Sequence, residues 1–127
     1  MNLPDFGKEE LREDYSPDGK SSFLRIPAVF SGKMDWFDGH FDFQRIFPGV
    51  GQLYVITFLA EKYFGVNLNG EGVCFDMVKY SRMILPDTET VITLTMKKGS
   101  ALNFVIADAG DETTIYSQGK CSVTEKQ

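Results

Sequence analysis

The chain has 127 residues, enough for one domain with a core of ordinary size and too few for two independent ones. Hydrophobic residues make up 43% of it and aromatic residues 13%, which excludes an intrinsically disordered chain. The net charge of -5 argues against nucleic acid or an anionic membrane as the main partner, because both require clustered lysine and arginine.

The two cysteines and the single histidine point away from metal and disulfide chemistry. Cys74 and Cys121 lie far apart, without a CxxC pair, so we expect two small hydrophobic side chains in a reducing compartment. We expect no metal and no cofactor. No apolar run reaches the ~18 residues of a membrane span, and the segment from Met1 to Asp5 does not resemble a signal peptide. A cytoplasmic location is therefore the expectation.

The first part of the chain is predicted to be an arm followed by a strand. Residues 1–20 are rich in charge and in turn formers, and we interpret them as an N-terminal arm in which the stretch GKEELRED could form a short helix. A single domain is then expected over 21–127. From Ser21 to Phe30 every second residue is apolar, which predicts a strand with one buried face.

A loop and a helix follow. Residues 32–47 show no sustained period but are rich in aromatic residues, and loops of that composition usually fold inward. From Gly49 to Phe64 the apolar residues recur at helical spacing on nearly all sides, which predicts a buried helix. Pro48 suits its first turn, and Gly65 can take the left-handed conformation that ends a helix.

After Gly72 the hydrophobic period changes to two. Strands are predicted over residues 73–84, 90–98, 101–107 and 113–123, with turn-forming residues between them. The fold class is therefore α+β: about five antiparallel strands in a sheet that curls around one long helix.

Two groups of residues within this pattern resemble a known family. The first is Gly39-His40-Phe41, then Ile46 and Pro48-Gly49-Val50, and the second is Asp76, Lys79-Tyr80, Arg82 and Pro86. Their spacing is similar to that of the hotdog-fold 3-hydroxyacyl-[acyl carrier protein] dehydratases of fatty acid synthesis, in particular the dehydratase-like proteins of aryl polyene clusters. The resemblance covers about residues 21 to 124.

The resemblance implies a chemistry for these residues. Dehydration of a 3-hydroxyacyl thioester needs a base that removes the proton next to the carbonyl and an acid for the departing hydroxyl. His40 is expected to be the base, since an imidazole titrates near neutral pH. The amide of Gly49, at the helix N-terminus, is expected to polarise the thioester carbonyl. The helix would line an acyl tunnel, and the residues expected to contact substrate are Phe41, Phe47, Val50 and Gln52.

One position departs from the family. The helix there carries a Glu or Asp at the fourth residue after Pro-Gly-Val, and this sequence has Tyr54. A phenol, with a usual pKa of ~10, holds its proton more tightly than a carboxyl group. Two prolines of the family's loop are also replaced, by Asp42 and Arg45. Tyr54 is assigned to the acid position, where it could equally be a packing or interface residue.

Three functions therefore remain open. The first is a hydro-lyase that acts on a 3-hydroxyacyl chain carried by acyl carrier protein or coenzyme A, in fatty acid, polyene or polyketide-type lipid synthesis. The second is a non-catalytic protein that binds acyl thioesters. The third is a hotdog thioesterase, for which only Asp38 and Asp42 could activate water. The family resemblance also implies a homodimer, which would protect an open strand edge.

Overall fold

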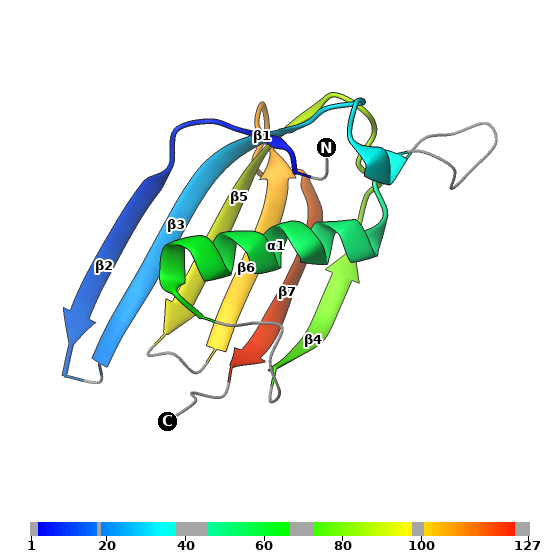
Figure 1. Cartoon of the computed structure of the whole chain (residues 1–127). Coiled ribbons are helices and arrows are strands. Elements are labelled where there is room, and N and C mark those ends of the chain that lie inside the picture. Colours follow the sequence, from blue (N-terminus) through cyan, green and yellow to red (C-terminus); the bar gives the residue numbers. More distant parts are fainter. Residues whose placement is uncertain (1–2, 18, 38–45, 67–72, 98–100, 124–127) are drawn as a thin grey trace.

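The computed structural model describes residues 3–17, 19–37, 46–66, 73–97 and 101–123. Figure 1 shows one helix lying across the concave face of a single curved sheet. The helix is α1 (Gly49–Phe64), and a short 3-10 helix, η1 (Asp35–Phe37), precedes it. The strands are β1 (Asp5–Phe6), β2 (Glu10–Ser16), β3 (Gly19–Phe30), β4 (Val73–Tyr80), β5 (Thr88–Lys97), β6 (Ala101–Asp108) and β7 (Ile115–Val123).

The sheet is antiparallel, with the strand order β1-β3-β5-β6-β7-β4, and β2 also pairs with β3. Within the described residues β4 pairs only with β7, so its other edge lies at the side of the sheet. In Figure 1 α1 starts near β4 and ends near β3. The first turn of α1 and the edge strand β4 therefore share one side of the molecule.

The core lies between α1 and the concave face of the sheet. Strand β3 alternates between buried and partly exposed residues, as its period of two predicts. Its buried residues pair in register with buried residues of β5, which pair in turn with buried residues of β6: Ile26 lies opposite Ile92, and Ile92 opposite Ile106. The buried side of α1 that packs against them consists of Gly51, Gln52, Val55, Ile56, Leu59 and Ala60.

The helix has the predicted bounds, but it is not buried all round. Gly65 ends it in the left-handed conformation (φ 70), as expected, and Pro48 is its N-cap residue. Val50 is 65% exposed and Tyr54 is 46% exposed, so the first turns of α1 present apolar side chains on the side that faces away from the sheet. The prediction that these two residues are buried was wrong, because the sheet of a single chain covers only one side of the helix.

The N-terminal segment differs from the expectation. Residues Glu10 to Ser16 form strand β2 and not a short helix, and β2 pairs with β3 along its whole length. The segment of residues 1–20 expected to be an arm thus supplies two strands to the same sheet, and the sheet has seven strands where about five were expected. Every residue of β2 is exposed. Its sequence therefore carries no hydrophobic alternation from which a strand could be predicted.

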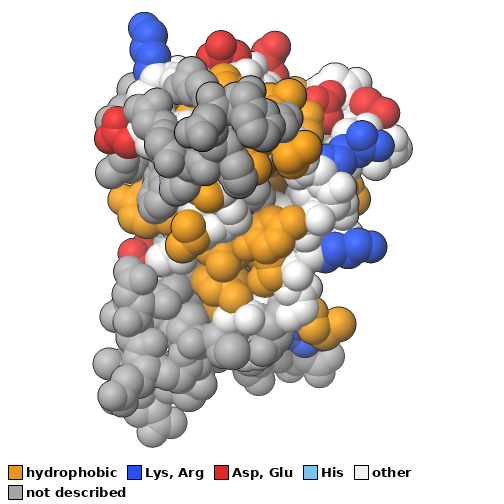
Figure 2. Space-filling model, turned by 90° about the vertical axis from the view of Figure 1, so that its right-hand side faces the viewer, with side chains coloured by type: hydrophobic (Ala, Val, Ile, Leu, Met, Phe, Trp, Pro, Cys, Tyr) orange, Lys and Arg blue, Asp and Glu red, His pale blue; other side chains and the backbone are white. Residues whose placement is uncertain are grey.

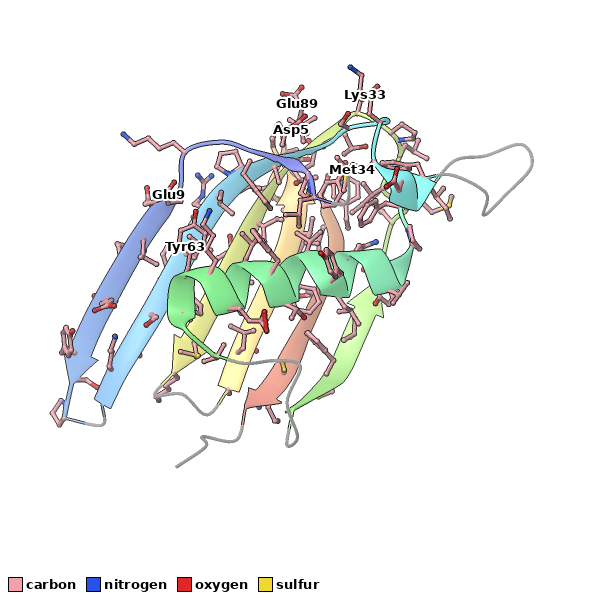
Figure 3. All side chains as sticks on the ribbon, viewed as in Figure 1. Asp5, Glu9, Lys33, Met34, Tyr63 and Glu89 are labelled. Atoms are coloured by element: carbon pink, nitrogen blue, oxygen red, sulfur yellow. The ribbon has the colours of Figure 1, made fainter. Side chains whose placement is uncertain are left out.

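The aromatic loop folds inward as predicted, as far as the structure describes it. The ring of Phe47 packs edge-on against Phe30 and Phe37, with centroid distances of 4.8 Å and 5.4 Å. Met34 is fully buried beside them, at the end of the molecule where α1 starts, whereas Tyr63 lies at its other end (Figure 3). Cys121 is fully buried in the hydrophobic core, as expected of a small hydrophobic side chain. The side chain of Cys74 lies outside the described residues.

From the sequence we expected no metal ion and no membrane span. Among the described residues, no group of three or more His, Cys, Asp or Glu side chains could hold a metal ion. In the same part of the chain, no helix has the length and hydropathy required to span a membrane.

Candidate functional site

The first turn of α1 lacks a side-chain cap. Its N-cap residue, Pro48, is extended (φ -71, ψ 153) and has no side-chain acceptor, while its carbonyl accepts a hydrogen bond from the N–H of Gln52 (3.1 Å). By the geometry of an α-helix, the N–H groups of Gly49, Val50 and Gly51 have no acceptor within the helix. They lie at the positive end of the helix dipole. This turn can therefore bind an oxygen atom that carries partial negative charge.

Phe47 fixes the entry into this turn. Its N–H donates to the carbonyl of Ile84 (2.8 Å), which ties the chain before the helix to the segment after β4. Its side chain is only 2% exposed and packs between the rings of Phe30 and Phe37. Phe47, which we expected to contact substrate, is thus placed in the hydrophobic core beside the first turn.

Gln52 is a polar residue on the buried side of α1. It is 3% exposed, and its Nε2 donates a long hydrogen bond to the carbonyl of Phe47 (3.4 Å). Its Oε1 has no hydrogen-bond partner among the residues that the structure describes. A buried polar atom without a partner costs about 1 to 3 kcal/mol, so such atoms are rare outside functional sites. Gln52 therefore offers an acceptor to a donor group next to the first turn.

Tyr80, at the end of β4, covers Gly49. A Cβ added to Gly49 would lie 2.7 Å from Cζ of Tyr80 and 2.9 Å from its hydroxyl oxygen. The Tyr80 hydroxyl donates to the carbonyl of Gly49 (3.3 Å), and burial raises the pKa of the phenol. The end of the Tyr80 side chain therefore occupies the space that a Cβ at position 49 would take. Tyr80 is part of the family pattern in the sequence, but no sequence signal showed that it reaches the helix.

A second buried polar oxygen lies beside Tyr80. Ser117 of β7 is the direct partner of Tyr80 across the strand pair and of Ile106 on the other side. Ser117 is fully buried, and no described residue is a hydrogen-bond partner of its Oγ. Gly49, Gln52, Tyr80 and Ser117 thus gather polar groups at the end of the core where α1 begins.

Tyr54 and Val50 lie on a different side of the helix. They are one turn apart, so both project from the open side of α1, away from Gln52. Figure 2, which views the side where β4 and the start of α1 lie, shows a hydrophobic area at its centre. Exposed hydrophobic residues on these elements are Val50, Tyr54, Met77 and Tyr80. Within one chain the structure does not bring Tyr54 next to Gln52.

His40 and Phe41 fall outside the described residues, as do Asp38 and Asp42. The described chain leaves this segment open between Phe37 and Ile46. The roles predicted for His40 and Phe41 therefore stay predictions.

A separate polar cluster lies at the turn between β6 and β7. The Tyr116 hydroxyl donates to Oδ1 of Asp108 (2.8 Å), and Oδ2 of Asp108 accepts from the N–H groups of Gly110 and Asp111. Burial, followed by the hydrogen bond to Asp108 and its negative charge, raises the pKa of Tyr116 to about 12. These bonds hold the turn in place and satisfy the carboxylate, so we assign them a structural role.

Comparison with solved structures shows the fold. An uncharacterised protein from Erwinia carotovora subsp. atroseptica is 23% identical, with a TM-score of 0.74 and 96% of each chain covered. A chain of the dehydratase heterocomplex ApeI:P from Xenorhabdus doucetiae is 22% identical, with a TM-score of 0.73 and coverage of 96% of this chain and 98% of that one. The protein yhdA of Lactococcus lactis, provisionally described as a thioesterase, is 13% identical, with a TM-score of 0.61 and 95% of each chain covered.

These likenesses confirm the predicted hotdog fold, with one helix wrapped by an antiparallel sheet. No curated protein sequence matches the chain. The family model of the ApeI-like dehydratases matches residues 18–120, a range that includes the whole of α1 and the strands β4, β5 and β6. The chain belongs to the ApeI-like dehydratase family.

Proposed function

We propose that this protein removes water from a 3-hydroxyacyl thioester to give a 2-enoyl thioester, a reaction that can be followed in reverse as hydration. The observation that supports this activity best is the first turn of α1, which lacks a side-chain cap and adjoins the unpartnered Oε1 of Gln52, in a chain of a dehydratase family. The acyl group would be carried by acyl carrier protein or coenzyme A. The substrate oxygen would accept hydrogen bonds from the helix amides.

His40 is proposed as the base. It would take the proton from the carbon next to the thioester carbonyl, and the negative charge that develops on the carbonyl oxygen would be stabilised by the amides at Gly49 and Val50. The hydroxyl group then leaves the neighbouring carbon with a proton, as water. His40 is the only histidine of the chain, so the pH dependence of turnover would report its ionisation.

Tyr54 is proposed to take the acid position from a partner subunit. It is 46% exposed on the open side of α1, beside Val50, where a second chain could cover it. The outer edge of β4 and the exposed Met77 lie on the same side of the molecule. Open strand edges and apolar patches of this kind favour association. We propose a homodimer that pairs along this side and brings Tyr54 of one subunit to His40 of the other.

A second candidate function rests on the same tyrosine. Removal of one acid–base partner typically slows a reaction by ~10² to 10⁴-fold, so a phenol in place of a carboxyl group favours a protein that binds acyl thioesters without turning them over. The related ApeI:P complex contains two kinds of chain. A second hotdog chain that supplies the carboxyl group is therefore the alternative to the homodimer.

The test uses the purified chain with crotonyl-coenzyme A, a 2-enoyl thioester. Loss of the conjugated double bond measures hydration, and release of free thiol measures thioesterase activity. We expect hydration that is abolished in His40→Ala, is reduced in Tyr54→Phe and rises about tenfold or more in Tyr54→Glu. Tyr63→Phe, on the same helix, is the control and should behave as the parent protein.

Other outcomes assign the alternatives. Thiol release without hydration would establish the thioesterase, and binding without either reaction would establish the non-catalytic protein. Sedimentation of the chain alone tests the dimer. A monomer that becomes active only when a second hotdog chain is added would replace the homodimer by a heterocomplex.

A further inference from the structure

The strand β4 contains a bulge that changes which way its last residues face. Phe75 packs its ring against Phe104 on the concave side of the sheet, with centroids 6.3 Å apart. Residues five apart in a regular strand lie on opposite faces. Tyr80 is five residues after Phe75, yet its side chain also contacts α1 on the concave side. The strand must therefore contain one extra residue.

That residue is in the segment between Asp76 and Lys79, where the pairing with β7 shifts register. Met77 has a positive φ of 53, a conformation that a side chain with a Cβ rarely adopts, and it is 87% exposed. Val78 then faces inward: its Cγ2 would lie 3.0 Å from a Cβ added to Gly119. A bulge at a strand edge commonly redirects a side chain, and strain of this kind is concentrated at functional sites.

Because of the bulge, the side chain of Tyr80 lies at the N-terminal end of α1, where the first amide N–H groups have no acceptor within the helix. Its hydroxyl lies 3.3 Å from the carbonyl oxygen of Gly49, a long and therefore weak hydrogen bond. The Gly49 carbonyl does not depend on this bond, since the helix itself provides it with a partner four residues on. The phenol can consequently exchange this acceptor for an oxygen of a ligand without leaving a buried group unsatisfied.

The polar groups around Tyr80 also point to a ligand. Two buried oxygens in this region, Oε1 of Gln52 and Oγ of Ser117, have no partner within the part of the chain that the structure describes, and Ser117 is the direct strand neighbour of Tyr80. A hydroxyl group or a water molecule carries the donors that they need. The first turn of α1 and the phenol, by contrast, present donors. A 3-hydroxyacyl thioester could pair with both sets of groups. Its carbonyl oxygen is an acceptor for the amides and the phenol, and its hydroxyl, two carbons away, is a donor for the buried oxygens.

We propose that Tyr80 contacts the substrate, and that its O–H, directed by the bulge at Met77, donates a hydrogen bond to the thioester carbonyl oxygen beside the amide of Gly49. This inference rests on the proposed acyl-thioester function and adds to it a second donor from the same subunit. The phenol acts without losing its proton: it is a neutral donor that strengthens its bond as charge develops on the oxygen. Tyr80 is then a catalytic residue of a kind distinct from the base and the acid.

The test removes only the hydroxyl. Tyr80→Phe keeps the ring that packs on Gly49, and Tyr116→Phe is the matched control because it removes a phenol hydroxyl from the neighbouring strand β7, away from α1. We expect kcat for hydration of crotonyl-coenzyme A to fall by about 10- to 10³-fold in Tyr80→Phe, as for loss of one such donor, and to change less than twofold in Tyr116→Phe.

A spectroscopic measurement separates a bond to the carbonyl from a structural effect. With crotonyl-coenzyme A labelled with ¹³C at the carbonyl and bound to the His40→Ala variant, we expect the carbonyl resonance to move toward its free position when Tyr80→Phe is added. An unchanged resonance together with an unchanged kcat would overturn the role of Tyr80 while leaving the dehydratase intact.

The inference can also be judged if the protein does not turn over substrate. The parent chain would then be inactive by itself, which rejects a dehydratase made of this chain alone, and the affinity for crotonyl-coenzyme A becomes the deciding measurement. Weaker binding by about fivefold or more in Tyr80→Phe, with Tyr116→Phe unchanged, would support the contact in a binding protein. Equal affinity of all three proteins, or no binding by the parent chain, would overturn it.

Discussion

The two ends of α1 are built in opposite ways. At the C-terminal end, Gly65 takes the left-handed conformation that closes a helix, and no atom of the described residues lies within 4 Å of the position its Cβ would occupy. At the N-terminal end Pro48 supplies no side-chain cap, and Gly49 is covered by the ring of Tyr80. Two glycines at the two ends of one helix thus serve different needs: the first accommodates a neighbouring side chain, and the second accommodates a backbone angle.

This difference separates a supporting part of the molecule from a part arranged for binding. The later turns of α1 contribute Leu59 and Ala60 to a fully apolar contact with the sheet. The first turns contribute Gln52, whose buried Oε1 has no partner among the described residues. Variants of α1 should therefore separate stability from activity. Three such variants follow in order of their effect on the free energy of unfolding, and a fourth prediction concerns strand β7.

The largest loss of stability is expected for Leu59→Ala. Leu59 is fully buried on the side of α1 that faces the sheet, and truncation of such a side chain costs about 2 to 5 kcal/mol. Urea denaturation of the variant measures the loss. Lys62→Ala, at an exposed position three residues on, is the control and should cost less than about 1 kcal/mol. Similar losses for the two variants would contradict the packing described for α1.

Gly65→Ala is expected to cost about 1 kcal/mol without affecting turnover. The cost has a backbone origin, because φ is 70 at this position and no atom obstructs the added methyl group. Thermal unfolding gives the stability, and hydration of crotonyl-coenzyme A under conditions where the variant is folded gives the activity. A parallel loss of both would mean that the two ends of α1 are not separable.

Gly49→Ala is expected to show the reverse behaviour. The added Cβ would meet the end of the Tyr80 side chain, which is 48% exposed and can turn outward at little cost, so the free energy of unfolding should change by less than about 1 kcal/mol. The displaced phenol should lower hydration to the level of Tyr80→Phe. If activity survives while the melting curve shifts, position 49 serves packing alone.

The last prediction concerns pH and a tyrosine outside the proposed site. The pKa of Tyr116 is raised from 10.0 to about 12, so the unfolded chain loses this proton before the folded chain does. The stability that the neutral phenol provides is fully present below pH 10 and is lost as the pH rises toward 12. Melting temperatures measured from pH 9 to 11.5 should fall less steeply in Tyr116→Phe than in the parent. Parallel curves would show that this phenol does not contribute.

Much of this fold could be predicted from local pattern. The bounds of α1, the left-handed Gly65 and the buried residues of β5 and β6 follow from periods of 3.6 and 2, which depend on the chain alone. Strand β2 could not be predicted in this way, because all of its residues are exposed and its pairing with β3 is made by backbone atoms. The exposure of Val50 and Tyr54 could not be predicted either, since the sequence of an apolar residue does not show whether it would pack against the sheet or against a second chain.

The sequence by itself determined the family pattern, the place of His40 just before the helix, and the replacement of an acidic residue by Tyr54. Only the tertiary structure decided that Tyr80 belongs with Gly49, which lies 31 residues earlier in the chain. That contact depends on a one-residue bulge at Met77, which exchanges the two faces of the strand beyond it. A register shift of this kind leaves no local signature in the sequence, because the extra residue of β4 is defined only by comparison with the residues of β7 that it pairs with.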